Sequence, residues 1–177
     1  MESNIIDQNI KAKFDEKIKE LEAKLPIMVK GVNCGELTLT SVLEILGIKN
    51  GIINNLIIPF GGGFGGYKSQ SGWSGACGAV SGGCAATGVI LGGKERMSND
   101  LIHVAELKAA KFATEFEKEF GSVQCSILCG YDFSDPNAFR EYRKNDTWAK
   151  TCYKFVVGAV DKVRKVMRKE LKKNWET

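Results

Sequence analysis

The chain has 177 residues, of which 44% are hydrophobic and 26% are charged. This length and composition are typical of one globular domain with an ordinary core, and they exclude a disordered chain. The net charge of +4 is modest, so charge alone does not indicate a nucleic-acid-binding protein. We expect one domain over residues 1–177, with residues 1–25 as an N-terminal helical extension.

Residues 5–24 are predicted to form an amphipathic helix that ends before Pro26. Its apolar positions recur at helical spacing: Ile6, Ile10, Phe14, Ile18 and Leu21. The first residues do not show a basic segment followed by an apolar one, which is the pattern of an export signal. We therefore expect a cytoplasmic protein.

A second helix is expected to begin near Asn33 and to stop at Gly47. The side chain of Asn33 can accept hydrogen bonds from the free backbone amides of the first turn. Cys34 then lies in that turn, where the positive end of the helix dipole stabilises a thiolate. The sequence thus predicts a lowered pKa for Cys34.

The segment 52–60 is short and apolar, and it is ambiguous between a helix and a strand. Pro59 argues against a central strand. The following residues 61–75 are rich in glycine and are predicted to form an irregular loop.

This loop contains a literal GxGxxG, formed by Gly61, Gly63 and Gly66. A dinucleotide site also needs an acidic residue about twenty positions later, and the nearest acid downstream is Glu95. The loop is not a P-loop either, because a tyrosine separates the last glycine from the Lys-Ser pair. We predict no nucleotide cofactor.

Residues 75–92 form an uncharged run of mostly small residues, too poor in large apolar side chains to span a membrane. Small side chains let neighbouring backbones approach closely, so we predict a buried central helix over residues 75–92. The chain shows no strand pairs and no repeats. The expected fold class is all-α, a single-domain bundle of about six to seven helices around the central one.

The C-terminal half is predicted to be helical over residues 98–120, 122–129, 136–144 and 147–173. The first of these helices, capped by Ser98, carries the apolar residues Leu101, Val104, Ala105, Leu107, Phe112, Phe116 and Phe120. The last carries Val156, Val160, Val163, Met167 and Leu171 beside a cluster of lysines and arginines. We interpret this basic cluster as a solvated helix face and expect neither nucleic acid nor a membrane as partner.

The chain has six cysteines: Cys34, Cys77, Cys84, Cys125, Cys129 and Cys152. In a reducing compartment a disulfide framework is not expected, which leaves metal binding, thiol chemistry or burial as small apolar side chains. Cys125 and Cys129 are four residues apart and share a helix face, so they could bind one metal centre or form a disulfide. Cys77 and Cys84 are too far apart along a helix for one small cluster. The single histidine, His103, excludes most zinc-hydrolase signatures.

Several ordered blocks resemble the C_GCAxxG_C_C family of redox-active proteins. Asn33-Cys34 resembles the family's helix start, PFGGGFG its FGGG segment, and CGAVSG, from Cys77 to Gly82, its CGAxxG motif. FGSVQCSILCGYDFSDP resembles the block of FGS, Cys and GYDLSDP, and TCYKFV resembles the closing cysteine element. The resemblance extends over most of the chain, from about residue 30.

The resemblance implies four functional cysteines, which are Cys34, Cys77, Cys125 and Cys152. Cys84 and Cys129 lie outside the pattern and are candidates for additional ligands or resolving thiols. The family is similar to the N-terminal part of split-Soret cytochromes, which are helical dimers with an iron–sulfur cluster beside haems. This implies a [2Fe–2S] or [4Fe–4S] cluster on the four cysteines and allows a homodimer. The chain has no CxxCH, so we expect no haem.

Three functions remain open at this point. The first is a small redox protein that binds an iron–sulfur cluster, for electron transfer to a partner protein or for redox sensing. The second is a thiol–disulfide enzyme in which Cys34 attacks and another cysteine resolves. The third is a protein that binds zinc or copper(I) on soft thiolates. The sequence names no substrate and leaves open whether the protein is an enzyme.

Overall fold

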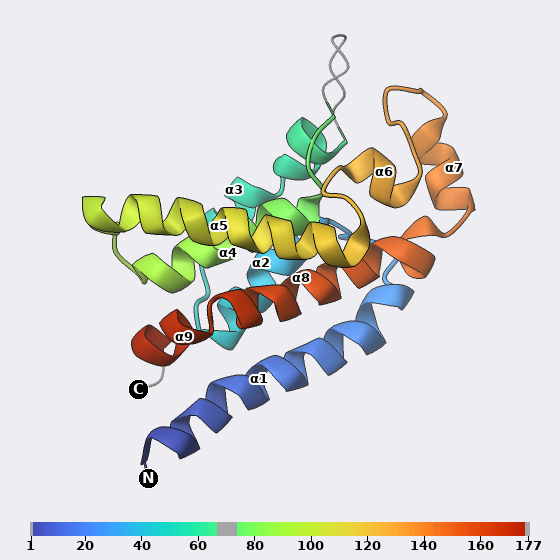
Figure 1. Cartoon of the computed structure of the whole chain (residues 1–177). Coiled ribbons are helices and arrows are strands. Elements are labelled where there is room, and N and C mark those ends of the chain that lie inside the picture. Colours follow the sequence, from blue (N-terminus) through green and yellow to red (C-terminus); the bar gives the residue numbers. More distant parts are fainter. Residues whose placement is uncertain (1, 67–73, 176–177) are drawn as a thin grey trace.

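The computed structural model describes residues 2–66 and 74–175, and this part of the chain is all-α, without β-strands (Figure 1). The longer helices are α1 (Glu2–Lys24), α2 (Cys34–Ile45), α4 (Gly78–Gly92), α5 (Asn99–Phe120) and α8 (Tyr153–Val166). The shorter helices are α3 (Gly51–Ile57), α6 (Cys125–Cys129), α7 (Ala138–Lys144) and α9 (Arg168–Trp175). They are joined by the 3-10 turn η1 (Leu25–Ile27) and the π-helices η2 (Gly61–Gly65) and η3 (Trp148–Cys152). The predicted fold class is confirmed.

Helix α4 lies at the centre of the bundle, where it packs against α2, α5 and α8. A Cβ atom added at Gly82 would lie 2.4 Å from the backbone oxygen of Gly35, and one at Gly78 would lie 2.8 Å from the Gly35 nitrogen. These distances leave no room for side chains, so α2 and α4 touch through their backbones. The prediction of a central helix is confirmed, although the helix begins at Gly78 and Cys77 is its N-cap.

The predicted cap of α2 is also confirmed, because the Asn33 side chain accepts a hydrogen bond of 3.0 Å from the Glu36 amide. The same side chain donates to the Ile58 carbonyl oxygen, 2.8 Å away, and so ties the start of α2 to the end of α3. The ambiguous segment 52–60 is mainly helical, since Asn50 caps α3.

The loop prediction for residues 61–75 is wrong in its first part, because Gly61–Gly65 forms the π-helix η2. Because glycine has no side chain, η2 can lie directly against neighbouring backbone: a Cβ at Gly65 would lie 3.2 Å from the Ala76 carbonyl oxygen. The Lys-Ser pair, Lys68 and Ser69, falls outside the described residues, which stop at residue 66 and resume at residue 74.

The apolar face of α1 is buried at Phe14 and Leu21, and α1 packs along α8 (Figure 1). Ile6 lies outside the part of α1 whose side chains are described. The single C-terminal helix predicted for residues 147–173 is instead three pieces, η3, α8 and α9. Its predicted apolar residues are all buried: Val156, Val160, Val163, Met167 and Leu171.

Two details of the 98–120 prediction are wrong. Ser98 precedes α5, but its side chain makes no capping hydrogen bond. Leu107 is 58% exposed, and Val104 is also exposed, because only the C-terminal part of α5, with Phe112 and Phe116, is buried in the core. The apolar spacing predicted that the N-terminal part of the helix is also buried, but other helices cover it less than they cover the C-terminal part.

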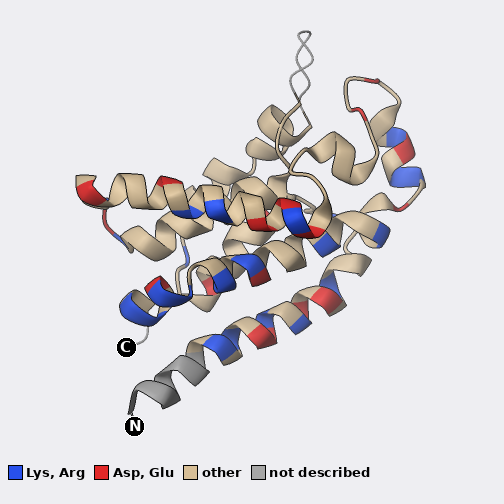
Figure 2. Ribbon diagram, viewed as in Figure 1, with Lys and Arg blue, Asp and Glu red and all other residues tan. Residues whose placement is uncertain are grey.

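Charged side chains are concentrated on α1, α5, α7, α8 and α9, whereas α3, α4 and α6 carry none (Figure 2). Part of the basic cluster is neutralised within the bundle: Lys162 pairs with Glu119 at 2.6 Å, and Arg164 pairs with Asp15 and Asp161. This pairing agrees with a structural role for the basic face. Within the described residues, no helix is both long and apolar enough to cross a membrane.

Candidate functional site

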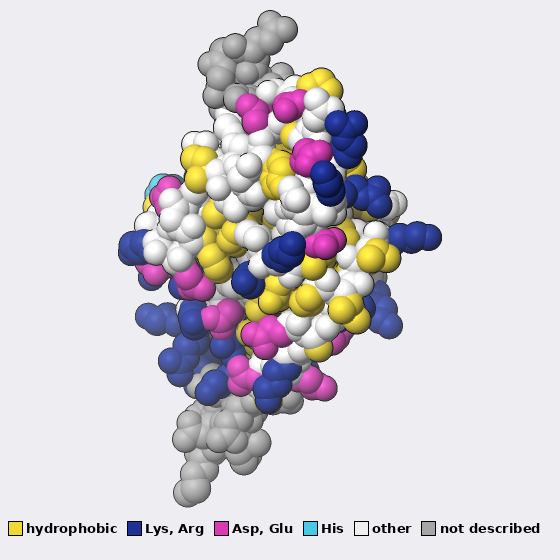
Figure 3. Space-filling view, turned by 90° about the vertical axis from the view of Figure 1, so that its right-hand side faces the viewer, with side chains coloured by type: hydrophobic (Ala, Val, Ile, Leu, Met, Phe, Trp, Pro, Cys, Tyr) yellow, Lys and Arg dark blue, Asp and Glu magenta, His cyan; other side chains and the backbone are white. Residues whose placement is uncertain are grey.

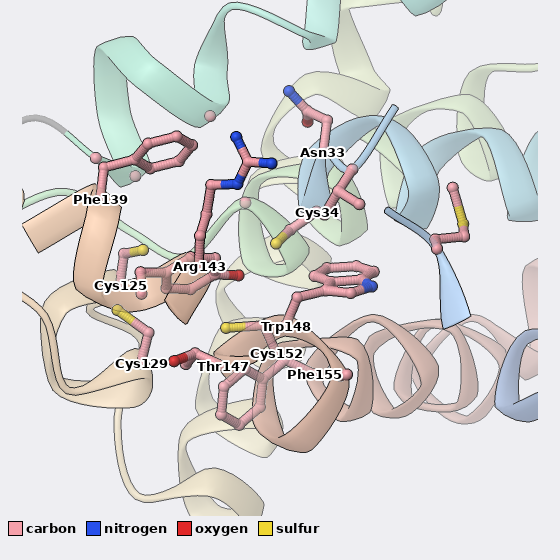
Figure 4. Close-up of a pocket in the computed structure, with 18 of the residues that line it drawn as sticks. Asn33, Cys34, Cys125, Cys129, Phe139, Arg143, Thr147, Trp148, Cys152 and Phe155 are labelled. Atoms are coloured by element: carbon pink, nitrogen blue, oxygen red, sulfur yellow. The ribbon is translucent and has the colours of Figure 1, made fainter. Parts of the chain in front are cut away.

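Five cysteines line one cavity of about 1010 Å³ at the end of the bundle that carries α6 and α7. Each comes from the end of a helical element: Cys34 starts α2, Cys77 caps α4, Cys125 and Cys129 start and end α6, and Cys152 ends η3. Figure 4 shows the side chains of Cys34, Cys125, Cys129 and Cys152 directed into this cavity. Cys77, Cys129 and Cys152 are at most 8% exposed, and all are free thiols. The fold therefore assembles a thiol site from residues scattered over most of the chain.

One wall of the cavity is aromatic, and the turn after α6 builds it. Gly130 takes the left-handed conformation that ends α6, and the Asp132 carboxylate accepts hydrogen bonds from the Ser134 amide and hydroxyl. This turn places Tyr131 and Phe133 against two rings of α7, Phe139 and Tyr142, with ring centroids 5.7–6.5 Å apart. Phe133 of the GYDFSDP block thus lines the cavity on this side.

The opposite lip of the cavity is formed by residues 26–33, together with glycines of η2. Several apolar side chains stay exposed there and on α7: Ile27 (78%), Val29 (84%) and Phe139 (61%). Figure 3 views the molecule from the side of α7 and shows hydrophobic side chains gathered across the middle of this face. The mouth of the cavity is therefore mainly apolar.

The thiols of Cys34 and Cys77 shift each other's pKa. The Cys77 thiol and burial hold the pKa of the Cys34 thiol well above its usual value. The pKa of Cys77 is lowered, first by the Cys34 thiol and then because the amides of Ala79 and Val80 at the start of α4 face it. The prediction of a lowered pKa for Cys34 is therefore wrong: the helix that favours a thiolate is α4, and the residue is Cys77.

Cys125 and Cys129 start and end α6, and the Cys129 thiol lies 3.8 Å from the Tyr131 carbonyl oxygen, to which it donates. The Cys125 thiol lowers the pKa of Cys129 to about 7, while the Cys129 thiol and burial raise the pKa of Cys125. In each pair the pKa of one thiol is lowered and the pKa of the other is raised.

Cys152 and Tyr142 both line the cavity. Burial raises the pKa of Cys152 to about 12, and a hydrogen bond with the Tyr142 side chain acts in the opposite direction. The pKa of the Tyr142 hydroxyl is itself raised, mainly by burial and then by the nearby Cys152 charge.

The thiols are spread around the cavity and do not converge on one point. Within residues 2–66 and 74–175, no three His, Cys, Asp or Glu side chains lie close enough together to hold a single metal ion. His103 does not contribute, since its exposed ring lies 3.6 Å from Glu106 on α5. The arrangement offers several soft sulfur donors around a space much larger than one ion needs.

Residues 32–166 match the family model described as "Putative redox-active protein (C_GCAxxG_C_C)". This match covers most of the chain. The chain belongs to the C_GCAxxG_C_C family. No curated protein and no solved structure matches it. The family's description supports a redox role, and the five cavity cysteines all lie within the matched residues.

The two cysteines outside the C_GCAxxG_C_C pattern have different surroundings. Cys129 lies in the cavity beside Cys125, whereas Cys84 faces α5, with its sulfur 3.9 Å from the Ala109 carbonyl oxygen. Burial raises the pKa of Cys84 to about 11. Cys84 thus packs against the core outside the cavity, and Cys129 is the fifth thiol of the cavity.

Sequence reasoning missed the other side chains that surround the thiols. Arg143 extends from α7 into the cavity (Figure 4), and Tyr142 and Trp148 line it. The aromatic residues of the GYDFSDP block could have indicated the aromatic wall. Arg143 and Trp148 belong to no sequence motif, so nothing in the sequence pointed to them. Among the residues that the structure describes, the Arg143 guanidinium has no hydrogen-bond or ion-pair partner.

Proposed function

We propose that the cysteine cavity binds an iron–sulfur cluster and that the protein uses it for electron transfer or redox sensing. The observation that carries this proposal is that five thiols, from four segments of the chain, line one cavity. The four cysteines of the family pattern, Cys34, Cys77, Cys125 and Cys152, would be the ligands. Such a cluster supplies a one-electron couple whose potential depends on hydrogen bonds to sulfur and on burial.

The donor set and the space both suit a polynuclear centre. Thiolates are the usual ligands of iron–sulfur clusters, and a cluster distributes its ligands over several metal atoms. Thiols that surround a cavity without converging on one point suit that distribution better than they suit a single zinc or copper(I) ion. A cytoplasmic location would keep these thiols reduced and free.

The protein's own residues would control access to the site and its charge. The rings of Phe133, Phe139 and Tyr142 line one side of the cavity that holds the thiols. The amides of Ala79 and Val80 stabilise negative charge on Cys77. The exposed apolar side chains around the mouth offer a redox partner protein a surface close to the buried thiols.

The test is metal and sulfide analysis of the full chain, purified and reconstituted without oxygen. We expect iron and acid-labile sulfide together, with charge-transfer absorption in the visible range. Cys77→Ser should lose both, whereas Cys84→Ser, which changes a cysteine outside the cavity, should keep them. Wild-type protein that stays colourless and free of iron after reconstitution would refute the proposal, and zinc or copper bound in its place would favour a soft-metal protein.

A second candidate is thiol–disulfide exchange, because Cys125 and Cys129 lie on one helical turn of α6 and both line the cavity. The thiolate of Cys129 would attack a substrate disulfide and expel one thiolate. Cys125, after losing its proton, would then attack the Cys129 sulfur and expel the second thiolate. The substrate disulfide is reduced by two electrons, and the protein keeps a Cys125–Cys129 disulfide.

Thiol counting separates this candidate from the first. If exchange is the function, metal-free protein treated with a small organic disulfide should lose two thiols, and mass spectrometry should find Cys125 linked to Cys129. An unchanged thiol count would eliminate the exchange mechanism. Cys34 is not the expected attacking residue, because Cys77 and Cys129 are the thiols whose pKa is lowered.

A further inference from the structure

The mouth of the cysteine cavity carries charge as well as apolar surface. The charged side chains that line the cavity are two cations, Lys30 and Arg143, and one anion, Asp146, so the lining has a net charge of +1. Within the described residues, none of the three forms an ion pair. The partly buried cations Lys108 and Lys162, elsewhere in the bundle, are each paired with a glutamate. The cavity therefore keeps one positive charge that a ligand can neutralise.

Arg143 is placed to use this charge. Its side chain extends from α7 into the cavity (Figure 4), and Lys30 belongs to the opposite lip. The planar guanidinium offers parallel N–H donors that match the two oxygens of a carboxylate. A carboxylate at the mouth would therefore find a complementary partner in Arg143.

Flat and apolar side chains lie beside this guanidinium. Phe139 is four residues before Arg143 on α7, so the two share a helix face. The ring of Phe139 stacks on Tyr142, with centroids 6.2 Å apart and an interplanar angle of 5°, yet the residue stays 61% exposed. Ile27 and Val29 of the opposite lip are exposed as well. A ligand with a flat apolar body would bury these side chains and could stack on the ring.

The cavity also has more space than a metal centre needs. Its volume of about 1010 Å³ is at the upper end of the range of small-molecule sites. The eight atoms of a [4Fe–4S] cluster at the thiols would fill only a small part of it. A docked partner protein would cover the mouth from outside without filling the space behind it. The remaining volume thus suits a small molecule.

We propose that the mouth of the cavity binds a small aromatic monocarboxylate, whose carboxylate pairs with Arg143 and whose rings pack against Phe139. The net charge of +1 favours a monoanion, because Asp146 would repel a second negative charge. The inference concerns the mouth and does not depend on which group the thiols hold.

The first test is isothermal titration calorimetry of the full chain with 2-naphthoate, on metal-free protein and after reconstitution. We expect saturable binding of one molecule per chain. 2-Naphthol has the same rings without the charge, and octanoate has the charge without the rings, so each should bind at least about fivefold more weakly. Absence of saturable 2-naphthoate binding would overturn the inference, and so would equally tight binding of either analogue.

Two arginine variants of α7 test the ion pair. Because Arg143 is exposed to solvent, we expect Arg143→Gln to weaken 2-naphthoate binding by about tenfold and to leave 2-naphthol binding unchanged. Arg140→Gln removes the same charge from the same helix, but Arg140 does not line the cavity and contacts Asn137 and Glu141. This control should keep wild-type affinity. An equal loss in both variants would overturn the role of Arg143.

Alkylation by iodoacetamide locates the ligand in metal-free protein. Saturating 2-naphthoate should slow the alkylation of Cys34 and Cys125, the less buried cavity thiols, and leave the rate at Cys84 unchanged, since Cys84 lies outside the cavity. Unchanged rates at Cys34 and Cys125 would overturn the inference, because the ligand then lies elsewhere.

The same experiments separate this inference from the proposed function. If wild type takes up no cluster but binds 2-naphthoate and is protected, the proposed function is wrong and the carboxylate site stands. If a cluster forms and 2-naphthoate does not bind, the carboxylate site is wrong and the proposed function stands.

Discussion

The two walls of the cysteine cavity are built in different ways. On the α2–α4 side, which holds Cys34 and Cys77, helices touch backbone to backbone at Gly35, Gly78 and Gly82. On the α6–α7 side, short helices are held by ring contacts and by a carboxylate-capped turn. In the first wall, a side chain added at these glycines would clash with the neighbouring helix. In the second wall, the thiols are surrounded by side chains, and these can be substituted without moving the helices. We therefore expect substitutions in the first to affect folding and substitutions in the second to affect redox properties.

The largest effect is expected at the contact between α2 and α4. In Gly82→Ala the new Cβ would lie 2.4 Å from the Gly35 carbonyl oxygen, so the helices must separate. We expect a loss of about 3 kcal/mol in the free energy of unfolding, measured by urea denaturation. Gly88 on the same helix is the control, since a Cβ there meets nothing within 4 Å, and Gly88→Ala should stabilise the protein by about 0.5–1 kcal/mol. Equal stability of the two variants would contradict the close backbone contact.

A smaller loss of stability is expected where η3 contacts η1, the turn that follows α1. The indole nitrogen of Trp148, at the start of η3, donates a buried hydrogen bond of 2.6 Å to the Leu25 carbonyl oxygen of η1. Trp148→Phe leaves that carbonyl without its donor, so we expect a loss of about 1–2 kcal/mol in the free energy of unfolding. Denaturation followed by circular dichroism measures it. An unchanged free energy of unfolding would show that the bond contributes nothing to closing the cavity.

The smallest effect is expected at Arg143 and concerns only the potential of a reconstituted cluster. The guanidinium at the cavity mouth attracts negative charge, but it is exposed to solvent, so its removal in Arg143→Gln should lower the midpoint potential by about 10–40 mV. Arg140 on the same helix does not line the cavity and already contacts Asn137 and Glu141, so Arg140→Gln should leave the potential unchanged. The unfolding free energy of both variants should stay within about 0.5 kcal/mol of wild type. A larger shift in Arg140→Gln would show that net charge, rather than position, decides.

The helices were predictable because each one follows from residues close together in sequence. Asn33 capped α2 as expected, and the spacing from Val156 to Leu171 identified the buried face of the last helices. The break near Met167 was not predictable, because the apolar spacing continues through it. The π-turn at Gly61–Gly65 was missed as well, since glycine is compatible with both loop and helix.

The site was predictable in its cysteines and not in its surroundings. The family pattern selected Cys34, Cys77, Cys125 and Cys152, and the structure brings them together. The helical spacing already placed Cys129 on the same face as Cys125. The pKa of Cys34 could not be predicted from its helix position, because it depends on Cys77, which lies more than forty residues later and becomes a neighbour only in the folded state.

Residues 26–30, which line one lip of the cavity, precede the residues 32–166 that match the family. The bond between Leu25 and Trp148 anchors this lip to the helix that carries Cys152. This part of the rim thus precedes the family match, whereas the thiols beneath it lie within the match. Variation in this short stretch could change which molecules reach the site while leaving its sulfur chemistry intact.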